Sequence, residues 1–307
     1  MKAVRIYDYN QPLVLEDVDI PEPGPGEVLV RVHAASLNPL DVKLHIGSMH
    51  AFFPLAFPYT LGTDFSGVVE KTGSLASHWR AGDRVVVESH PTRGGALAEF
   101  ALADSNNLVR LPESISFADA AGIPIAAGTA WQALFEVADL TKGQTVLIHA
   151  GAGGVGSFAI QFARQAGARV IATASGAGLD LVRRLGADQI IDYTSQDFGS
   201  IVSDVDLVVD TIGGETQQTS YGVLRTGGSL LATSAPPDEA MAKAHKISAT
   251  FVYHQPEASR LSKIVRTVED GNIKVLTDSH RGLADFQAAL DHQASGRAKG
   301  KIILSIG

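Results

Sequence analysis

The chain has 307 residues, a formal net charge of −8 and no cysteine. This length can bury a substantial core and favours two domains. The negative charge argues against electrostatic binding to nucleic acid or to an anionic membrane, and the lack of cysteine excludes disulfides and Cys-ligated zinc. We find no apolar run of transmembrane length and no signal-peptide pattern at Met1–Ala3, so we expect a cytoplasmic protein with no membrane partner.

Residues 1–122 alternate short apolar segments with turns. A rigid turn, Pro21–Gly26, separates two of these segments. This alternation of short apolar segments and turns predicts a twisted, partly closed antiparallel barrel. The predicted strands are Val4–Tyr7, Leu13–Leu15, Glu27–His33, Ser66–Glu70, Arg84–Glu88 and Ala96–Ala101.

Residues 123–255 alternate strands with helices, which predicts a doubly wound parallel sheet in an α/β domain. From residue 256, two helices (Ala258–Asp270 and Leu283–Ala294) and a final strand (Lys301–Ser305) should return to the first domain. The two predicted domains are therefore 1–122 with 256–307, and 123–255. The predicted strands of the second are 145–150, 169–174, Gln189–Ile191, Val205–Asp210, Gly228–Thr233 and Ser248–Tyr253.

A glycine-rich loop joins the first of these parallel strands to a helix predicted over Ser157–Ala166. Residues 151–156 read G-x-G-x-x-G in strand–loop–helix–strand context, which is typical of dinucleotide binding. We expect Gly151 to permit the tight turn, Gly153 to let the backbone approach a pyrophosphate, and Gly156 to let the helix pack closely. The helix N-terminus would then offer free N–H groups to the phosphates.

The end of the second parallel strand bears on the choice of cofactor. An NAD site usually has an acidic residue there for the ribose 2′-OH, but this strand ends in Thr173-Ala174-Ser175-Gly176. The missing carboxylate permits a 2′-phosphate, and Ser175 can donate a hydrogen bond to it. Arg183 and Arg184 in the next helix could reach that phosphate, although helix arginines are usually solvated. NADPH is therefore predicted, with NADH as the alternative.

Taken together, the order and spacing of several motifs resemble the medium-chain dehydrogenase/reductase superfamily, and within it the zinc-free quinone oxidoreductase and enone reductase group. The resemblance implies a GroES-like partial barrel plus a Rossmann domain. The matching stretches are His33–Asp41, Leu61–Val69, Ala81–Val85, Gly94–Phe100, Leu111–Pro112, Ala120–Pro124, Val146–Gly156, Gly186–Tyr193, Asp206–Gly214 and Gly300–Leu304.

Residue types bear on whether a metal is bound. This chain has Asn38 and Thr63 where the zinc-dependent members carry Cys and His, and it lacks their four-cysteine lobe. Asp41 and Asp64 remain without a matching His or Cys, so we expect no zinc. Without a Lewis acid, the expected reaction is hydride delivery to an electrophilic acceptor, a small hydrophobic quinone or an enone.

The resemblance implies three catalytic candidates. The Asn38 amide could donate to a carbonyl, although an Asn38-Pro39 turn needs no function. The Lys43 ammonium could stabilise an enolate, although a solvated lysine is as common. Tyr59 could stack on the acceptor or supply the final proton, although core packing is the more common fate of such a residue.

The resemblance also implies cofactor contacts. Thr129 would face the nicotinamide, and Ser175 with Tyr193 would bind the 2′-phosphate. One departure is Gly178, at the position where NADPH-binding members usually carry lysine. The pyrophosphate contacts would be Ala152, Gly153, Gly154, Val155 and Gly156. Contacts at the carboxyl ends of strands four and five would be Thr211, Gly213, Thr233 and Ser234. The residues closing over the cofactor would be Phe251, Val252, Tyr253, Arg297 and Lys299.

Two other functions stay open at this point. One is an enoyl-thioester reductase of the same superfamily, although no basic run suggests a site for a coenzyme A tail. The other is a non-catalytic NADPH-binding protein.

We also expect a homodimer, formed by pairing of the exposed strand Ser248–Tyr253 across a two-fold axis. Aromatic residues that suggest a flat acceptor, or simply a core, are Phe52, Phe53, Phe57 and Trp131.

Overall fold

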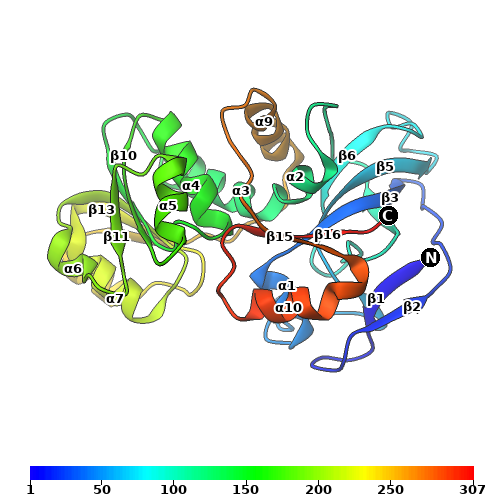
Figure 1. The fold of residues 1–307 in the computed structure, drawn as a ribbon, viewed down its shortest axis with the longest axis horizontal. Coiled ribbons are helices and arrows are strands. Elements are labelled where there is room, and N and C mark those ends of the chain that lie inside the picture. The colour runs from blue at the N-terminus through cyan, green and yellow to red at the C-terminus, as the bar shows by residue number, and fades with distance from the viewer. The chain divides into compact units, whose positions relative to one another are not determined.

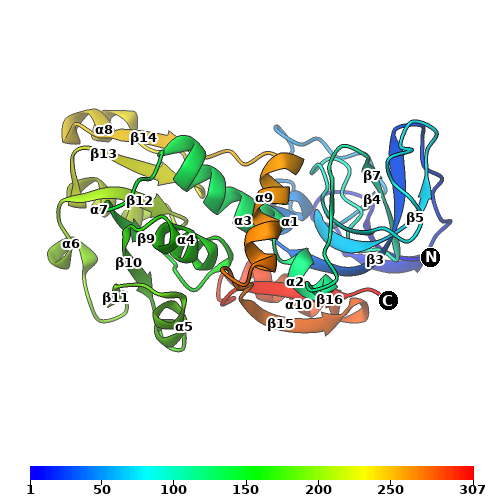
Figure 2. The same cartoon turned by 90° about the horizontal axis from the view of Figure 1, so that it is seen from above.

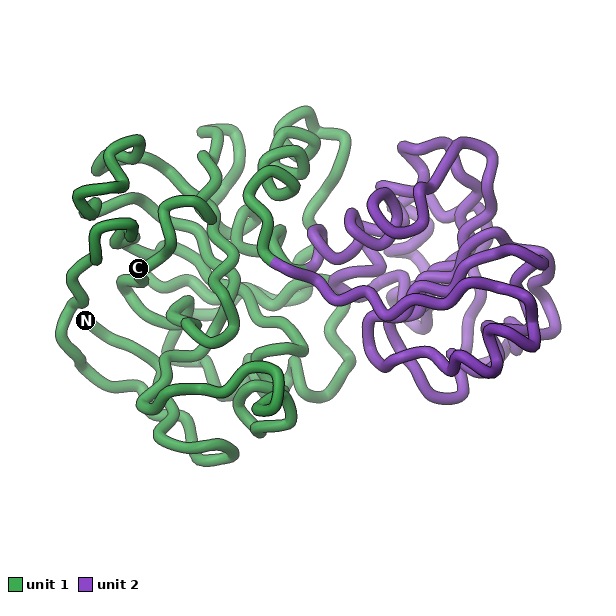
Figure 3. Tube along the Cα trace, turned by 180° about the vertical axis from the view of Figure 1, so that it is seen from behind, with its two compact units in different colours: residues 1–125, 256–307 green, residues 126–255 purple.

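A computed structural model describes residues 1–307. The chain forms two compact units, which Figure 3 colours separately. Unit 1 comprises residues 1–125 and 256–307, and unit 2 comprises residues 126–255. Each unit has its own buried apolar core.

Unit 1 is built on antiparallel sheets, as its alternating pattern predicted. A three-stranded sheet has the order β2-β1-β4, and a seven-stranded sheet has the order β15-β16-β3-β5-β6-β8, with β7 pairing with β3. Only β15 and β16 pair in parallel. The strands are β1 (Lys2–Ile6), β2 (Val14–Asp17), β3 (Glu27–Leu37), β4 (Tyr59–Thr60), β5 (Asp64–Thr72), β6 (Arg84–Glu88), β7 (Phe100–Asp104), β8 (Leu108–Arg110), β15 (Thr277–Gly282) and β16 (Lys301–Ser305).

The long strand β3 organises unit 1, since it pairs with β5, β7 and β16. Its residues Val28, Val30 and Val32 are almost completely buried in the core. Leu29 is buried as well and Arg31 is the one exposed residue of β3, so the strand is covered on both faces over most of its length. The helices of this unit are α1 (Pro39–His45), α2 (Phe117–Ala121), α9 (Ala258–Glu269), a 3₁₀ turn (Leu283–Asp285) and α10 (Phe286–Ala294).

Unit 2 is a doubly wound α/β domain, which confirms the predicted fold class. Its six parallel strands have the order β11-β10-β9-β12-β13-β14, which reverses direction beside β9. Figures 1 and 2 show helices packed against this sheet, with α4 beside α5. The strands are β9 (Thr145–Ile148), β10 (Arg169–Ala174), β11 (Gln189–Asp192), β12 (Val205–Asp210), β13 (Leu224–Ala232) and β14 (Ser248–Phe251).

The helices α4 (Gly154–Gln165), α5 (Gly178–Leu185), α6 (Phe198–Ile201), α7 (Gly214–Val223) and α8 (Glu239–His245) connect these strands. Before them, α3 (Pro124–Trp131) continues into a π-helical turn, Gln132–Val137. No helix in the structure has both the length and the apolar character needed to cross a bilayer.

Several predicted boundaries were wrong; β13, for example, begins at Leu224 rather than at Gly228. A strand was expected over Ala96–Ala101, but β7 begins only at Phe100, and Ala98 makes a single bridge to Ala3. The helix expected from Ser157 begins three residues earlier, at Gly154. Alanine-rich and glycine-rich segments carry little periodicity, so the pattern of apolar residues locates their ends poorly.

Candidate functional site

The glycine loop of unit 2 lies between β9 and α4. Gly156 packs so tightly on this loop that a Cβ added there would lie 2.3 Å from the Ala150 carbonyl oxygen. The residue with left-handed backbone angles is Ala150, at φ 49°, whereas Gly151 has no positive φ. The expectation that Gly151 supplies the tight turn was therefore wrong. Gly151 is needed for packing, because a Cβ there would lie 3.0 Å from side-chain carbons of three neighbours.

The N-terminus of α4 has no side-chain cap. Its N-cap residue is Gly153, whose backbone is extended and which offers no side-chain acceptor. The first N–H groups of a helix have no intrahelical partner, and they carry the positive end of the helix dipole. An uncapped twelve-residue helix beginning inside a glycine loop fits a pyrophosphate held by Gly153, Gly154, Val155 and Gly156, next to the buried Ala152.

Two hydroxyl groups meet at the carboxyl ends of β10 and β11. The Ser175 hydroxyl donates to the Tyr193 hydroxyl across 2.8 Å, and Tyr193 is 58% exposed. Of the nearby cations, Arg183 is ion-paired with Asp180. Gly178 is buried, and a Cβ there would lie 3.0 Å from the Ala152 Cβ, so a lysine at this position would press on the glycine loop. This packing gives a physical reason for the missing lysine.

The carboxyl ends of β12 and β13 are fixed by Asp210. Its carboxylate accepts from the Gly213 N–H at 2.9 Å, and its carbonyl accepts from the Thr233 N–H at 2.9 Å. The Thr211 hydroxyl donates to the His149 carbonyl at 3.1 Å. These contacts hold the predicted residues of this edge, including half-buried Ser234, next to the end of β9.

The remaining predicted cofactor residues differ in how far they are exposed to solvent. In unit 2, Phe251 and Tyr253 are exposed, whereas Thr129 is buried. The Val252 side chain is buried and its N–H donates to the Ala232 carbonyl, and its contact with a cofactor stays a prediction. In unit 1, Arg297 is exposed and the Lys299 N–H donates to Asp278.

Unit 1 buries a polar cluster where three strand ends meet. Asn38 follows β3, Asp64 begins β5 and Lys301 begins β16, and both β5 and β16 pair with β3. The exposed fractions are 2% for Asn38, 0% for Asp64 and 3% for Lys301. The topology of the sheet therefore brings together residues that are far apart in the sequence.

Each polar contact in this cluster is specific. The Asn38 Nδ2 donates to Asp64 Oδ2 at 3.0 Å, and the Lys301 ammonium donates to Asn38 Oδ1. The same ammonium lies 3.6 Å from Asp64 Oδ2, which also accepts from the Ile125 N–H at 3.2 Å. Asp64 Oδ1 is buried without a hydrogen-bond partner.

Asp41 completes the cluster through the backbone. Its Oδ2 accepts from the Asn38 N–H at 2.7 Å in a capping box that begins α1, and its Oδ1 accepts from the Thr63 hydroxyl at 3.4 Å. Burial raises the pKa of Asp41 to about 7, and burial also raises the pKa of Asp64 to about 6 despite the nearby Lys301 ammonium. The Asn38-Pro39 dipeptide is thus a helix start, and the Asn38 side chain joins a buried network.

The other two catalytic candidates lie outside this network. Tyr59 is buried in the core and its hydroxyl donates to the Pro91 carbonyl at 2.6 Å, which agrees with the core packing given above as the alternative to a catalytic role. Burial raises its pKa further above the usual value, which makes it a poor proton donor. Lys43, in the last turn of α1, is half-buried, and its ammonium has no hydrogen bond or ion pair. Asp41, which was expected to orient Lys43 or the backbone, accepts from the Asn38 backbone N–H and from the Thr63 hydroxyl, and it therefore holds the backbone.

The aromatic residues expected to line an acceptor site have different environments. Phe52 is 71% exposed, Phe53 is buried, and Phe57 packs against the unit 1 core. In unit 2, Trp131 packs edge-to-face on Phe162. Among these four, Phe52 is the one that presents most of its ring to solvent.

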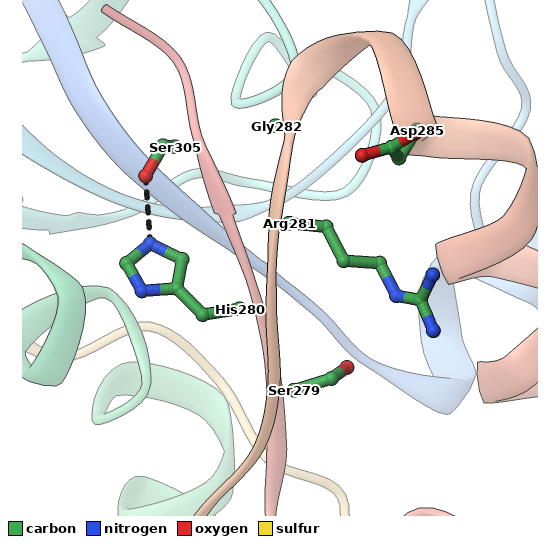
Figure 4. A pocket seen from close by; sticks show the side chains of 6 residues that line it. All are labelled: Ser279, His280, Arg281, Gly282, Asp285 and Ser305. Carbon is green, nitrogen blue, oxygen red and sulfur yellow. Dashed lines mark hydrogen bonds between the residues drawn. The ribbon is translucent and has the colours of Figure 1, made fainter.

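A polar pocket lies at the other end of β15 and β16 (Figure 4). The His280 ring and the Ser305 hydroxyl are hydrogen-bonded across 2.6 Å on one side of β15, and Arg281 points to the other side. Ser305 is four residues beyond Lys301, which is ~13 Å along a strand. None of the predicted site residues lines this pocket, which is formed by Ser279, His280, Arg281, Gly282, Asp285 and Ser305.

No three His, Cys, Asp or Glu side chains converge into a group that could hold a metal ion. The cluster at Asn38 contains two aspartates, but its cation position is taken by the Lys301 ammonium. Lys301 was not predicted as a site residue. The only sequence signal was a lysine placed directly before the apolar run Ile302–Leu304, in the stretch Gly300–Leu304.

Comparisons with known proteins agree with this architecture. Residues 24–113 match the family described as "Alcohol dehydrogenase GroES-like domain", and residues 185–304 match "Zinc-binding dehydrogenase". The chain is 35% identical over 305 residues to the quinone-oxidoreductase homolog of Spinacia oleracea, covering 94% of this chain and 92% of that protein. It is 33% identical over 322 residues to the 2-methylene-furan-3-one reductase of Solanum lycopersicum, covering 99% and 79%.

The fold also matches solved structures. A mycobacterial protein complexed with NADPH superimposes with a TM-score of 0.90 at 29% identity, over 100% of both chains. The predicted combination of a GroES-like barrel and a Rossmann domain is therefore confirmed. The chain belongs to the quinone oxidoreductase group of the medium-chain dehydrogenase/reductase superfamily and is an oxidoreductase.

Proposed function

We propose that the chain is an NADPH-dependent reductase that works without zinc and transfers a hydride to a quinone or an α,β-unsaturated carbonyl. The observation that carries this proposal is the combination, in unit 2, of an uncapped glycine helix N-terminus with the Ser175–Tyr193 hydroxyl pair. The names of the spinach and tomato relatives and the NADPH complex of the mycobacterial protein support the acceptor class and the cofactor.

Bound NADPH supplies a hydride, and the protein must stabilise the charge that the acceptor oxygen gains. Asn38 is the first candidate, because each amide nitrogen carries two hydrogens and only one of them is given to Asp64. A preorganised donor in a buried site stabilises developing charge far better than water does. Lys43 is the second candidate, because its ammonium has no partner in unit 1.

The residues around Asn38 support the proposed acceptor class. An alcohol needs activation by a Lewis acid or a base before it loses hydride, and the cation held here is the Lys301 ammonium rather than a coordinated metal. A quinone or an enone is already electrophilic, so donated hydrogen bonds suffice. The exposed ring of Phe52 offers a flat apolar surface to such an acceptor.

The test is oxidation of NADPH, and in parallel of NADH, with a panel of quinones, enones and aldehydes, followed by absorbance with and without a chelator. We expect consumption of NADPH that is insensitive to chelator and selective for quinones or enones. Turnover that chelator abolishes, or that is confined to alcohols and aldehydes, would contradict the proposal. Cofactor binding without turnover of any acceptor would favour an enoyl-thioester substrate or a non-catalytic role.

A further inference from the structure

Lys301 is the most deeply buried ammonium of unit 1, and its contacts determine the orientation of the Asn38 amide. The side chain is 3% exposed, and its ammonium donates to Asn38 Oδ1. On the other side of the amide, Asp64 Oδ2 accepts from Nδ2 at 3.0 Å. Asn38 therefore lies between a group that can only donate and a carboxylate that accepts.

An asparagine amide can usually turn by 180° and exchange its donor and acceptor ends. Here the reversed orientation would put the amide nitrogen against an ammonium and the amide oxygen against a carboxylate. Both contacts would be repulsive, and all three groups are buried from water, so neither could be relieved by solvent. The Asn38 backbone N–H is also held, by Asp41 Oδ2.

We propose that Lys301 is a positioning residue, which fixes the Asn38 amide so that its second Nδ2 hydrogen is offered to the oxygen of the acceptor. This inference rests on the proposed function, in which Asn38 is the donor. Lys301 itself need not touch the acceptor, because it acts through Asn38. The role belongs to the ammonium as a hydrogen-bond donor to Oδ1, and Asp64 supplies the complementary acceptor.

The first test does not depend on turnover. In amide-resolved NMR of the ¹⁵N-labelled full chain, the Asn38 side-chain pair is assigned by its loss in Asn38→Ala. We expect Lys301→Met to shift this pair and to speed the exchange of its hydrogens with solvent. An Asn38 pair that is unchanged in Lys301→Met would overturn the proposal, whatever the wild-type chain reduces.

The second test is a double-mutant cycle on kcat for the best acceptor. We expect Lys301→Met to lower kcat about 10- to 100-fold, the size of effect that misplacing a catalytic donor produces, with an unchanged KM for NADPH. Combining it with Asn38→Ala should lower kcat no further than Asn38→Ala alone. Losses that multiply would show that Lys301 acts independently of Asn38 and would overturn the proposal.

Lys301→Gln separates hydrogen bonding from charge and serves if Lys301→Met does not fold. Glutamine keeps a donor toward Asn38 Oδ1 and removes the charge. We expect kcat within about threefold of wild type, because roughly 1.4 kcal/mol corresponds to a tenfold change and a retained donor loses less than that. A loss as large as that of Asn38→Ala would overturn the proposal. A wild-type chain that reduces no acceptor would refute the proposed function, and the NMR test would still decide the orientation.

Discussion

The Ser175 hydroxyl donates to the Tyr193 hydroxyl across 2.8 Å, at adjacent ends of β10 and β11. Of the two arginines in α5, Arg183 is paired with Asp180, whereas Arg184 is exposed and has no ion pair; Gly178 occupies the usual lysine position. The two hydroxyl groups are neutral donors, which bind a 2′-phosphate less strongly than charged ones.

Ser175→Ala should therefore reduce the preference for NADPH without abolishing binding. A hydrogen bond to a charged group contributes roughly 1.5–3 kcal/mol when buried, and less at an exposed site, so we expect about a tenfold rise in KM for NADPH. The KM for NADH should change less than twofold. Steady-state kinetics with both cofactors check this, and Tyr193→Phe, which keeps the ring but removes the second hydroxyl of the pair, should show the same selective loss for NADPH. An equal loss for both cofactors would contradict the assignment of the 2′-phosphate to this edge.

Lys43→Ala tests the second candidate donor of unit 1. If the free ammonium stabilises the enolate, kcat for an enone should fall by one to two orders of magnitude, the effect of removing one charged donor. The KM for NADPH should stay the same, because Lys43 is not among the predicted cofactor contacts. Lys43→Arg keeps the charge and should retain more activity. Unchanged enone turnover in Lys43→Ala would make the lysine a solvated side chain.

Gly156→Ala tests the packing of the glycine loop. The new Cβ would lie 2.3 Å from the Ala150 carbonyl, a backbone atom that cannot rotate away, so the loop must shift. We expect loss of cofactor binding, measured by NADPH fluorescence, and a lower thermal midpoint. Gly222→Ala, in α7 of the same unit, is the control, because a Cβ there would meet no heavy atom within 4 Å. Equal cofactor binding by Gly156→Ala and wild type would refute the predicted role of this loop.

Much of the fold could be predicted because strand and helix periodicities differ and glycine marks the turns. The strand before the glycine loop, the alternation of strands and helices in unit 2 and the returning tail were predicted in this way, but the order of the strands in the sheet was not. Local patterns failed where the determining contact is tertiary. Ala150 adopts left-handed angles, at φ 49°, in place of Gly151, because the loop must turn there while Gly151 packs against its neighbours.

The buried cluster shows the limit of sequence reasoning more clearly. Asn38 was predicted as a site residue, but its partner Lys301 lies 263 residues away. A lysine at the start of a strand usually keeps its charge in water. Here β16 pairs with β3, and the register that aligns Ile302 with Leu37 places Lys301 beside Asn38. Only the topology of the sheet could show that this lysine is buried.

The two buried aspartates give the stability of the protein a specific dependence on pH. Burial raises the pKa of Asp41 to about 7 and that of Asp64 to about 6, whereas the ordinary value is 3.8. The folded state thus binds more protons than the unfolded state between about pH 4 and 7. The contribution of these groups to the free energy of unfolding is present at low pH and is lost as the pH rises through this window.

Asp41→Asn should flatten this dependence. Each group contributes at most about 1.4 kcal/mol per pH unit, and asparagine cannot titrate. Its side-chain oxygen can still accept from the Asn38 N–H, so the start of α1 is kept. Urea unfolding between pH 4.5 and 8 should show a shallower slope than wild type. An unchanged slope would mean that Asp41 titrates at its ordinary pKa. Glu27 and Asp278 have lowered pKa values, so their effect on the free energy of unfolding falls at a lower pH than that of the two buried aspartates.

The predicted homodimer can be tested at the edge strand β14. This strand ends the sheet of unit 2 and pairs only with β13. The Val252 N–H donates to the Ala232 carbonyl, so proline at position 252 would break a hydrogen bond inside the protomer and would be a poor test of assembly. Because alternate residues of a strand point their N–H groups to opposite sides, the Ala249 N–H faces the open edge.

Ala249→Pro should therefore remove an outward donor while sparing the pairing with β13, since proline is tolerated where the N–H side of a strand is unpaired. If β14 pairs with β14 of a second protomer across a two-fold axis, each substituted strand loses a main-chain hydrogen bond and gains a steric clash at the junction. The mass measured by light scattering should then fall from that of a dimer to about half. Val252→Pro, the control, should lower the thermal midpoint as well. A wild-type monomer, or a dimer that persists in a folded Ala249→Pro variant, would exclude β14 as the interface.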